Sequence, residues 1–365
     1  MTPAALHIGI EATRLLRERR GIGRYVHNLL RWIPRHRDDV RFTLFAARAS
    51  DEKAVRTLLD TMDPSLSERT TVCDIGALAR SDADVIWYPW NWVHPRAQRA
   101  AMVVSLLDIA PMLQLDGRWW KVLKRARFRR RFATSLRDAD LVLTISEFSA
   151  QELVQRLHAD PSRIRVTLLA ADDMQRSASD HSTTLERLGI TGPFFLTVGA
   201  HDKRKNLSTL YRAMELLHER GERVPLVQAG PHRETVAPSS VSYAGYVDDV
   251  ELTTLYRLAT ALVFPSRYEG FGLPVVEAMA AGGRVICADA SSLPEVVGSA
   301  GLLFPWHDAR ALAAQMSKLL HDDALRARLT RDGLLQAQRF TWSATARQTL
   351  DAFDEAVRVR ARRRE

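Results

Sequence analysis

Two glutamates with seven residues between them flank a turn in the stretch SRYEGFGLPVVE, residues 266–277. The apolar run at 261–265 is typical of a short buried strand, and Pro274 near the start of VVEAMAAG predicts a helix that ends at Gly282. The turn between strand and helix contains Glu269, Gly270, Phe271 and Gly272, and Leu273 directly follows it. Its glycines let a ligand approach the backbone, and amides at a helix start favour anionic oxygens. The turn is therefore a candidate anion-binding site.

The same turn places a carboxylate next to amides that suit phosphate. A carboxylate does not bind phosphate, but it accepts hydrogen bonds from hydroxyl groups. A nucleotide-sugar presents both chemistries, because its diphosphate lies between a hexose and a ribose. The alternative is structural: Glu269 caps the helix, and Glu277 is a solvated helix residue. Spacing alone leaves both interpretations open.

The stretch SRYEGFGLPVVEAMAAG resembles the glutamate, seven residues, glutamate motif of retaining glycosyltransferase family 4. SSLPEVVGSAGLLF, which contains Glu295, resembles the family's next segment, and the similarity extends over residues 6–355. The resemblance implies an α/β fold of the GT-B type, in which two Rossmann-like, doubly wound parallel-sheet domains face each other across a cleft. It also implies that Glu269 binds hydroxyls of the donor sugar, that residues 270–273 hold sugar or phosphate oxygens, and that Glu277 holds the ribose.

Three cations stand in the loop GAHDKRKN, residues 199–206, between an apolar strand predicted at 194–198 and a following helix. Cations at this place suit a diphosphate and stabilise the charge that develops on a departing nucleotide. Arg204, Lys205 and Asn206 resemble the family's arginine–lysine–asparagine motif, which implies that Lys205 and Arg204 bind the phosphates. A solvated cluster of charges in a loop is the alternative.

The N-terminal part contains a second glycine-bearing turn between a strand and a helix. After a strand predicted at 7–10, Gly21 and Gly23 open a helix whose apolar residues recur at helical spacing: Tyr25, Leu29, Leu30 and Ile33. Such turns cradle phosphates, although GIG is not the full dinucleotide fingerprint. EATRLLRERRGIGRYVHNLL resembles the family's N-terminal signature, which implies that both glycines approach the donor across the cleft. In relatives the nucleotide base lies near the counterparts of Tyr246 and Val247.

The strand predicted at 102–106 ends where this chain departs from the family pattern. The family usually carries histidine followed by aspartate here, close to the transferred sugar, whereas this chain has Leu107 and Asp108. Because leucine can neither donate a hydrogen bond nor share charge, we expect donor binding to persist while the contacts to the sugar differ. The aromatic segment at 87–92 is predicted to be a loop at a strand end, which either stacks on an acceptor sugar or packs on the protein.

Residues 117–137 form the most basic stretch, with nine lysines and arginines and no acidic residue. As a helix it places four residues on one face: Trp119, Val122, Leu123 and Ala126. Such a helix can lie on an anionic membrane surface, where each basic residue contributes roughly 1 kcal/mol. A solvated helix packed on the sheet is the alternative, and no nucleic-acid-binding motif accompanies the charge. The arginines at 358–364 either reinforce this contact or form a frayed tail.

Length and composition set the remaining expectations. A chain of 365 residues with 46% hydrophobic residues predicts two domains, 1–175 and 185–342. The resemblance implies that a last helix, at 343–365, crosses back and packs on the first domain. No apolar run is long enough for a membrane span, and no secretion signal begins the chain. Cys73 and Cys287, both in apolar runs, predict reduced core residues of a cytoplasmic protein. The net charge of +9 indicates an anionic partner.

Together these features predict an enzyme, a retaining hexosyltransferase with Glu269, Lys205, Arg204 and Asp108 in catalytic positions. The GIGRY-type N-terminus resembles bacterial mannosyltransferases of surface-polysaccharide assembly. That resemblance implies a donor such as GDP-mannose or a GDP-deoxyhexose, and a glycan or polyprenyl-linked acceptor at the inner face of the cytoplasmic membrane. No metal is expected, because the cations take its place in stabilising the leaving group. No cofactor and no nucleic-acid partner are expected either. The alternatives are a nucleotide-sugar epimerase of the same fold and a non-catalytic protein that binds nucleotide-sugar or a membrane surface.

Overall fold

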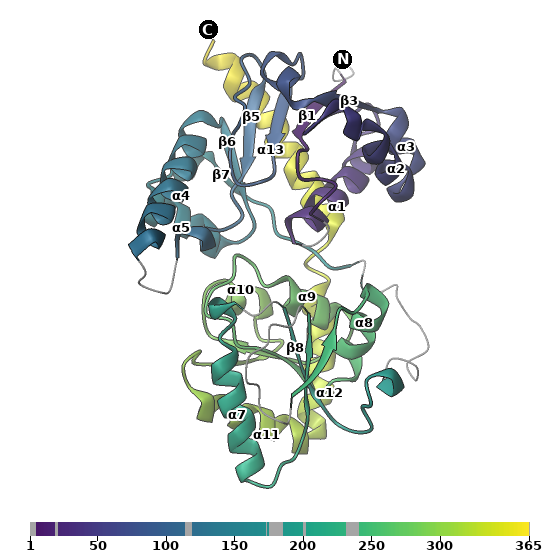
Figure 1. The fold of residues 1–365 in the computed structure, drawn as a ribbon, viewed down its shortest axis with the longest axis vertical. Helices are drawn as coiled ribbons and strands as arrows, with labels where there is room; N and C mark the ends of the chain where they lie inside the picture. Colours follow the sequence, from purple (N-terminus) through teal and green to yellow (C-terminus); the bar gives the residue numbers. More distant parts are fainter. Residues whose placement is uncertain are drawn as a thin grey trace. The chain divides into compact units, whose positions relative to one another are not determined.

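The computed structural model describes residues 5–18, 21–113, 119–172, 174, 185–199, 202–230 and 241–364. Contacts divide the chain into two compact units (Figure 1). Unit 1 comprises Met1–Leu169 and Trp342–Glu365, and unit 2 comprises Ala170–Thr341. The sequence DDMQRSASDHSTT, residues 172–184, is polar and predicts the linker between the two domains, and most of it lies outside the described residues.

Unit 1 is built on a sheet of seven parallel strands in the order β3-β2-β1-β4-β5-β6-β7. The order reverses between β1 and β4, which makes the sheet doubly wound. The strands are β1 (His7–Glu11), β2 (Arg41–Ala46), β3 (Thr70–Asp74), β4 (Val85–Tyr88), β5 (Ala101–Ser105), β6 (Leu141–Thr144) and β7 (Ile164–Val166). The helices are α1 (Ile22–His36), α2 (Glu52–Met62), α3 (Pro64–Glu68), α4 (Trp119–Asp138), α5 (Glu147–Leu157) and α13 (Trp342–Arg362), with short turns η1 (Ala49–Asp51), η2 (Ile75–Arg80), η3 (Ala110–Met112) and η4 (Pro161–Arg163).

Unit 2 repeats this design with six parallel strands in the order β10-β9-β8-β11-β12-β13. The strands are β8 (Phe195–Val198), β9 (Leu226–Ala229), β10 (Val241–Gly245), β11 (Ala261–Phe264), β12 (Val285–Ala288) and β13 (Leu302–Phe304). The helices are α7 (Leu207–Glu219), α8 (Asp249–Leu258), α9 (Leu273–Ala280), α10 (Leu293–Val297), α11 (Ala309–His321) and α12 (Asp323–Ala337), with the short turn η6 (Lys203–Lys205). The predicted fold class is confirmed, because each unit is a doubly wound parallel-sheet α/β domain.

The last helix, α13, belongs to unit 1 and lies along its sheet (yellow in Figure 1). It packs on α1, β5 and β6. The residues predicted to form the inner face of α1 are buried: Tyr25, Leu29, Leu30 and Ile33. Phe353 of α13 packs against Trp87 of the sheet, with 6.0 Å between the ring centroids. The chain therefore returns to unit 1 and completes its core.

The aromatic segment at 87–92 is not simply a loop, and the stacking interpretation is wrong for its buried members. Its first two residues lie in β4 and are fully buried. The indole N–H of Trp87 donates to Ser105 Oγ at 2.8 Å, and that of Trp90 donates to the carbonyl of Glu11 at 2.8 Å. A buried donor needs such a partner. These rings are therefore part of the core and do not face a ligand.

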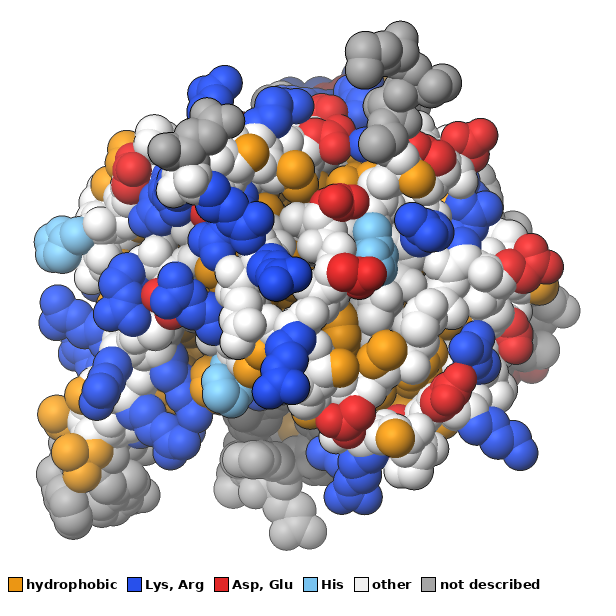
Figure 2. Space-filling view, turned by 90° about the horizontal axis from the view of Figure 1, so that it is seen from above, with side chains coloured by type: hydrophobic (Ala, Val, Ile, Leu, Met, Phe, Trp, Pro, Cys, Tyr) orange, Lys and Arg blue, Asp and Glu red, His pale blue; other side chains and the backbone are white. Residues whose placement is uncertain are grey.

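The basic helix α4 does not bury the face predicted from the sequence. Val122 and Leu123 are 65% and 67% exposed, whereas Phe132 and Leu136 are buried. The side chains of Trp119 and Trp120 lie outside the described residues. Figure 2 shows Lys and Arg side chains gathered on the left of the face it draws, the side on which α4 lies in Figure 1. The apolar residues near the start of α4 thus lie at the surface among cations.

The C-terminal arginines form specific contacts with unit 1, so the frayed-tail interpretation is wrong for two of them. Asp140 is fully buried, and its carboxylate accepts a hydrogen bond from the N–H of Met102 at 2.9 Å. Arg363 Nη1 lies 2.9 Å and Arg360 Nη1 lies 3.9 Å from the other carboxylate oxygen. A buried carboxylate requires partners of this kind, because its removal from water is costly. The pairing fixes the end of α13 to the sheet.

The two cysteines occupy different environments, and both are free. Cys287 of β12 is fully buried, and burial raises the pKa of its thiol. Cys73 is only half-buried, because β3 is the edge strand of its sheet. The predicted core position is therefore confirmed for Cys287 alone. Within the described part of the chain, no helix is both long and apolar enough to cross a bilayer.

We expect Arg363→Ala to lower the free energy of unfolding of unit 1 by about 1–3 kcal/mol, because the buried carboxylate of Asp140 loses a charged donor. The exposed neighbour Arg362 provides the matched control, and its alanine variant is expected to change stability by less than about 0.5 kcal/mol. Urea unfolding of both variants measures the difference. Equal losses of unfolding free energy in the two variants would show that the specific contact of Arg363 with Asp140 does not stabilise unit 1.

Candidate functional site

The candidate site lies where the strand order of unit 2 reverses, between β8 and β11. Ligands of doubly wound sheets bind beyond the carboxyl ends of strands at such a point. Two loop segments follow these ends, with described residues 199 and 202–206 after β8 and 265–272 after β11. The N–H of Arg267 in the second loop donates to the carbonyl of Arg204 in the first at 2.7 Å, so the loops lie side by side.

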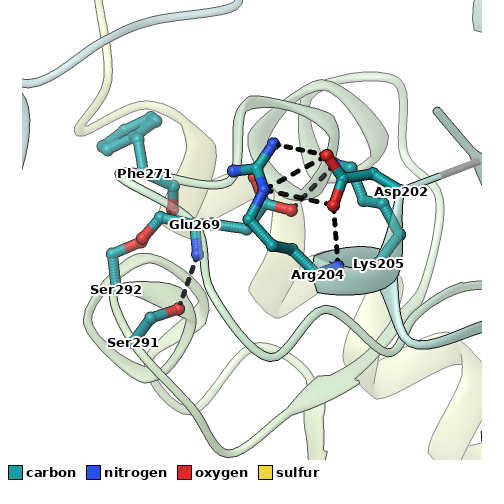
Figure 3. A network of polar contacts seen from close by, with 7 residues as sticks. All are labelled: Asp202, Arg204, Lys205, Glu269, Phe271, Ser291 and Ser292. Atoms are coloured by element: carbon teal, nitrogen blue, oxygen red, sulfur yellow. Dashed lines mark hydrogen bonds and ion pairs between the residues drawn. The ribbon is translucent and has the colours of Figure 1, made fainter. Parts of the chain in front are cut away.

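The central contact of the site is an ion pair between these loops (Figure 3). Lys205 Nζ lies 2.8 Å from Glu269 Oε1, and the two side chains are 17% and 15% exposed. The same ammonium lies 4.6 Å from the centroid of the Phe264 ring. A side chain on Gly199 would meet the Lys205 chain at 3.3 Å, so this glycine leaves room for it. The structure therefore brings together the predicted phosphate-binding cation and the predicted hydroxyl-binding carboxylate.

Arg204, the second predicted phosphate ligand, is turned toward Asp202 (Figure 3). Its Nε and Nη2 both lie 3.3 Å from the carboxylate of Asp202, which also accepts a hydrogen bond from the N–H of Arg204 at 2.8 Å. Burial acts to raise the pKa of Asp202, but the N–H and the guanidinium of Arg204 outweigh it and lower that pKa below its usual value. The contact of Arg204 with phosphate stays a prediction.

Asn206, the third member of the arginine–lysine–asparagine motif, has a structural role. It adopts a left-handed conformation with φ of 53° between η6 and α7. Its side-chain Nδ2 donates to the carbonyls of Pro265 at 3.1 Å and Trp306 at 2.6 Å. These bonds fasten the loop after β8 to the loop after β11. Asn206 thereby positions the adjacent Lys205.

The turn that carries Glu269 is fixed by two serines that sequence reasoning did not select (Figure 3). The N–H of Glu269 donates to Ser291 Oγ at 3.0 Å. The hydroxyl of Ser292, which is fully buried, lies 3.0 Å from the carbonyl of Glu269 and 2.8 Å from that of Phe271. The sequence signal for both serines is their place at the start of the segment SSLPEVVGSAGLLF, which resembles the family pattern.

Gly272 determines how the turn enters α9. It is the N-cap residue, with φ of 103°, and a Cβ there would lie 2.6 Å from Leu293 Cδ2. Because the cap has no side chain, the alternative that Glu269 caps this helix is wrong. Phe271 is 2% exposed and packs edge-to-face on Phe340, so its side chain belongs to the core. The predicted ligand contacts at 270–273 stay a prediction.

Glu277 is not a solvated helix residue, which was the structural alternative. It is 5% exposed, and its Oε2 accepts a hydrogen bond from the hydroxyl of Tyr256 at 2.9 Å. Tyr256 lies in α8 and is itself fully buried. Sequence reasoning missed this tyrosine, because the distance of 21 residues between the two gives no periodic signal. Tyr256 is a positioning residue for the Glu277 carboxylate.

The pair predicted to lie near the nucleotide base is split between surface and interior. Gly245 at the end of β10 has φ of 66°. Tyr246 after it is 75% exposed, whereas Val247 is 5% exposed. The base contact expected here stays a prediction.

The site residues predicted in unit 1 have local structural partners. Asp108 Oδ1 accepts a hydrogen bond from the N–H of Ala110 at 2.9 Å and so begins η3. Leu107 is 5% exposed, and its N–H donates to Asn91 Oδ1 at 2.9 Å. The leucine in the usual histidine position therefore belongs to the core of unit 1.

The local structure explains why glycine occupies positions 21 and 23 at the start of α1. Gly21 is the N-cap residue with φ of 54°. A Cβ on Gly23 would lie 1.6 Å from the carbonyl oxygen of Glu18, so only glycine fits there. The predicted approach of both glycines to a donor stays a prediction.

A buried carboxylate at the strand reversal of unit 1 was missed by sequence reasoning. Glu11 ends β1 and is 2% exposed. Its Oε1 accepts a hydrogen bond from the N–H of Thr13 at 3.1 Å, and its Oε2 is buried without a hydrogen-bond partner among the described residues. Burial raises its pKa.

Two known families match this chain. Residues 19–173 match the family described as Glycosyltransferase Family 4, and residues 185–335 match the family described as Glycosyl transferases group 1. The O-antigen chain mannosyltransferase B of Escherichia coli is 36% identical over 234 residues, which cover 60% of this chain and 61% of that protein. The matched part thus spans less than two thirds of that relative's length.

Solved structures share the fold of the whole chain. A sucrose-phosphate synthase from Thermosynechococcus elongatus is similar with a TM-score of 0.74 at 19% identity, over 96% of this chain and 98% of that chain. HepE from Anabaena, in complex with UDP and glucose, is similar with a TM-score of 0.71 at 17% identity, over 96% of this chain and 100% of that chain. At these identities the likeness shows the fold, which is the GT-B fold expected from the sequence.

We expect Ser292→Ala to lower the free energy of unfolding of unit 2 by about 1–3 kcal/mol, because two carbonyls of the turn lose the buried hydroxyl whose single hydrogen they share. Ser299→Ala, at an exposed serine after α10, is the control and is expected to stay within about 0.5 kcal/mol. Urea unfolding compares the two. A loss as small as that of the control would mean that the turn keeps its shape without this hydroxyl.

Proposed function

The chain belongs to the glycosyltransferases that combine a family 4 domain with a group 1 domain, and on that premise we propose that it transfers a hexose from a nucleotide-sugar to an acceptor hydroxyl with retention of configuration. The observation that supports this most directly is the sheltered Lys205–Glu269 pair at the strand reversal of unit 2. A nucleotide-sugar presents its diphosphate and its hexose side by side. One cation and one carboxylate in contact offer matching partners for both.

The proposed reaction exchanges one bond at the anomeric carbon. The acceptor oxygen forms a bond to that carbon while the bond to the diphosphate oxygen breaks, and the acceptor proton passes to the leaving diphosphate on the same face. Lys205 and Arg204 stabilise the charge on the leaving group. Glu269 holds hydroxyls of the sugar and does not act as general base. Glu277, held by Tyr256, binds the ribose.

The proposed donor is GDP-mannose or a related GDP-sugar. The support is the E. coli O-antigen chain mannosyltransferase B, which is 36% identical over the matched part. HepE, whose structure contains UDP and glucose, supports a nucleotide-sugar as the ligand class of this fold. The reaction is proposed to proceed without a metal, because Lys205 and Arg204 are proposed to stabilise the leaving group in its place.

The proposed acceptor is a glycan or polyprenyl-linked sugar, reached from the inner face of the cytoplasmic membrane. The support lies in α4, where the exposed Val122 and Leu123 stand among lysines and arginines. A helix of this composition is suited to an anionic lipid surface. Peripheral contact through α4 would bring the enzyme to a lipid-linked acceptor.

Equilibrium binding of GDP, UDP, ADP and dTDP to the purified chain tests the donor. We expect GDP to bind at least about tenfold more tightly than the others, which corresponds to about 1.4 kcal/mol, the scale of one or two hydrogen bonds to a base edge. The affinity is expected to be the same in EDTA. Binding of none of the four, or a requirement for a divalent cation, would contradict the proposal.

Catalysis is tested with Glu269→Gln and Lys205→Met, which keep the size of each side chain and remove its charge. We expect each variant to lower kcat by roughly 10²–10³-fold, because a group that contacts the reacting sugar or the leaving group is lost. Lys318→Met, at an exposed position of α11, is the charge-matched control with unchanged turnover. Near-normal turnover in either site variant would refute its role, and thermal unfolding verifies that all three variants are folded.

A further inference from the structure

A small cavity in unit 1 follows the carboxyl end of β5 and has a volume of about 200 Å³. Its lining combines apolar side chains from the segment around η3 with arginines from α4 and α5: Ile109, Met112, Leu113, Arg125, Arg129 and Arg156. Pockets that enclose a whole small molecule measure roughly 300–1,000 Å³. This cavity therefore suits one chemical group of a larger ligand.

The helical register of α4 turns two of these arginines toward the cavity. Val122, Arg125, Arg129, Phe132 and Leu136 recur at intervals of three and four residues, so they share one face of the helix. Phe132 and Leu136 on this face are buried in unit 1. Arg125 and Arg129 thus stand where a helix that merely packs would carry apolar residues. Val122 extends the same face outward.

Among the described residues around the cavity, one of its three arginines has a carboxylate partner and two have none. The Nε of Arg156 lies 2.8 Å from both carboxylate oxygens of Glu152, so this arginine is compensated. In the described part of the chain, the side chains of Arg125 and Arg129 take part in no hydrogen bond or ion pair. Two guanidinium groups without a charged partner in the described ranges therefore lie beside the apolar side chains of the cavity.

We propose that this cavity binds the phosphate of an acceptor whose aliphatic chain lies on the apolar residues, an inference that rests on the glycosyl transfer proposed above. A guanidinium binds a phosphate through two parallel N–H groups. Ile109, Met112 and Leu113 contact the chain next to the phosphate, and Val122 continues the apolar surface outward. The acceptor class that fits is a glycan joined to a lipid through phosphate, because a phosphate-free glycan supplies neither group.

The position of the cavity agrees with an acceptor role. Asp108, one of the catalytic positions predicted from the sequence, directly precedes Ile109 of the cavity wall. The hydrogen bond from the N–H of Ala110 fixes its carboxylate at the start of η3. An acceptor held by its phosphate lies at the same end of β5 as this aspartate.

The test compares two double variants of the full chain with the same charge change on the same helix. Arg125→Gln/Arg129→Gln removes two of the three cationic side chains of the cavity and leaves Arg156, whereas Arg127→Gln/Arg130→Gln removes two exposed charges outside it. Calorimetry measures the binding of geranyl diphosphate, inorganic pyrophosphate and geraniol. GDP binding to the same proteins is the control for the nucleotide site of unit 2.

We expect geranyl diphosphate to bind the unaltered chain more tightly than pyrophosphate or geraniol, and Arg125→Gln/Arg129→Gln to weaken it by about tenfold or more. The Arg127→Gln/Arg130→Gln variant is expected to bind it within about twofold of the unaltered chain. Equal weakening in both double variants would overturn the inference, since the arginines would then act only as general surface charge. Unchanged affinity in the cavity variant would overturn it as well.

Two further readouts separate this inference from related ideas. If GDP binds neither the unaltered chain nor the variants, the proposed function fails, while the geranyl diphosphate comparison still decides the cavity. Vesicles with and without phosphatidylglycerol report general lipid attraction. We expect both double variants to lose vesicle binding to a similar degree, because both remove two cations from α4. A selective loss of vesicle binding in the cavity variant, with geranyl diphosphate affinity unchanged, would assign Arg125 and Arg129 to the lipid headgroups and overturn the inference.

Discussion

The ion pair between Lys205 and Glu269 is the constraint on which the geometry of the candidate site depends. The two residues are 64 positions apart and come from loops that leave neighbouring strands. Both side chains are largely sheltered from water, where opposite charges attract more strongly than at the surface. A pair of this kind holds its geometry only if both loops are rigid. Most of the polar contacts around the site provide that rigidity.

Several residues near the pair shape the backbone. Ser292 ties two carbonyls of the Glu269 turn to the segment before α10, and Asn206 ties the lysine loop to the loop after β11. Gly272 permits a left-handed backbone where any side chain would meet Leu293. Loops that carry function are positioned by rigid elements in this way, with supporting contacts behind the groups that meet the ligand. The site is thus supported by residues that do not themselves present charge to it.

The excess of arginine in unit 1 serves separate purposes. Arg363 and Arg360 neutralise the buried Asp140 and hold α13 to the sheet. Arg131 stacks its guanidinium on the ring of Trp92, with 4.2 Å to the centroid. Arg125 and Arg129 of the cavity beside η3 have no such partner within the described residues. The net positive charge of the chain therefore does not identify a single binding surface, because some of the arginines form contacts within the fold.

The sequence by itself determined the features that depend on local pattern. Chain length predicted two domains, the resemblance to a known family implied that both are doubly wound, and the glycines and Pro274 located the turn at 269–272 before α9. The tertiary structure decided which distant groups meet: the pairing of Glu277 with Tyr256, of Asp140 with Arg363, and the direction in which Arg125 and Arg129 face. The physical reason is that hydrophobic periodicity reports only the secondary structure of one segment. Contacts between residues far apart in the sequence form only when the fold brings their segments together. The inward face of α4 could also be identified only from the tertiary structure. That face carries arginines at positions where an amphipathic pattern predicts apolar residues.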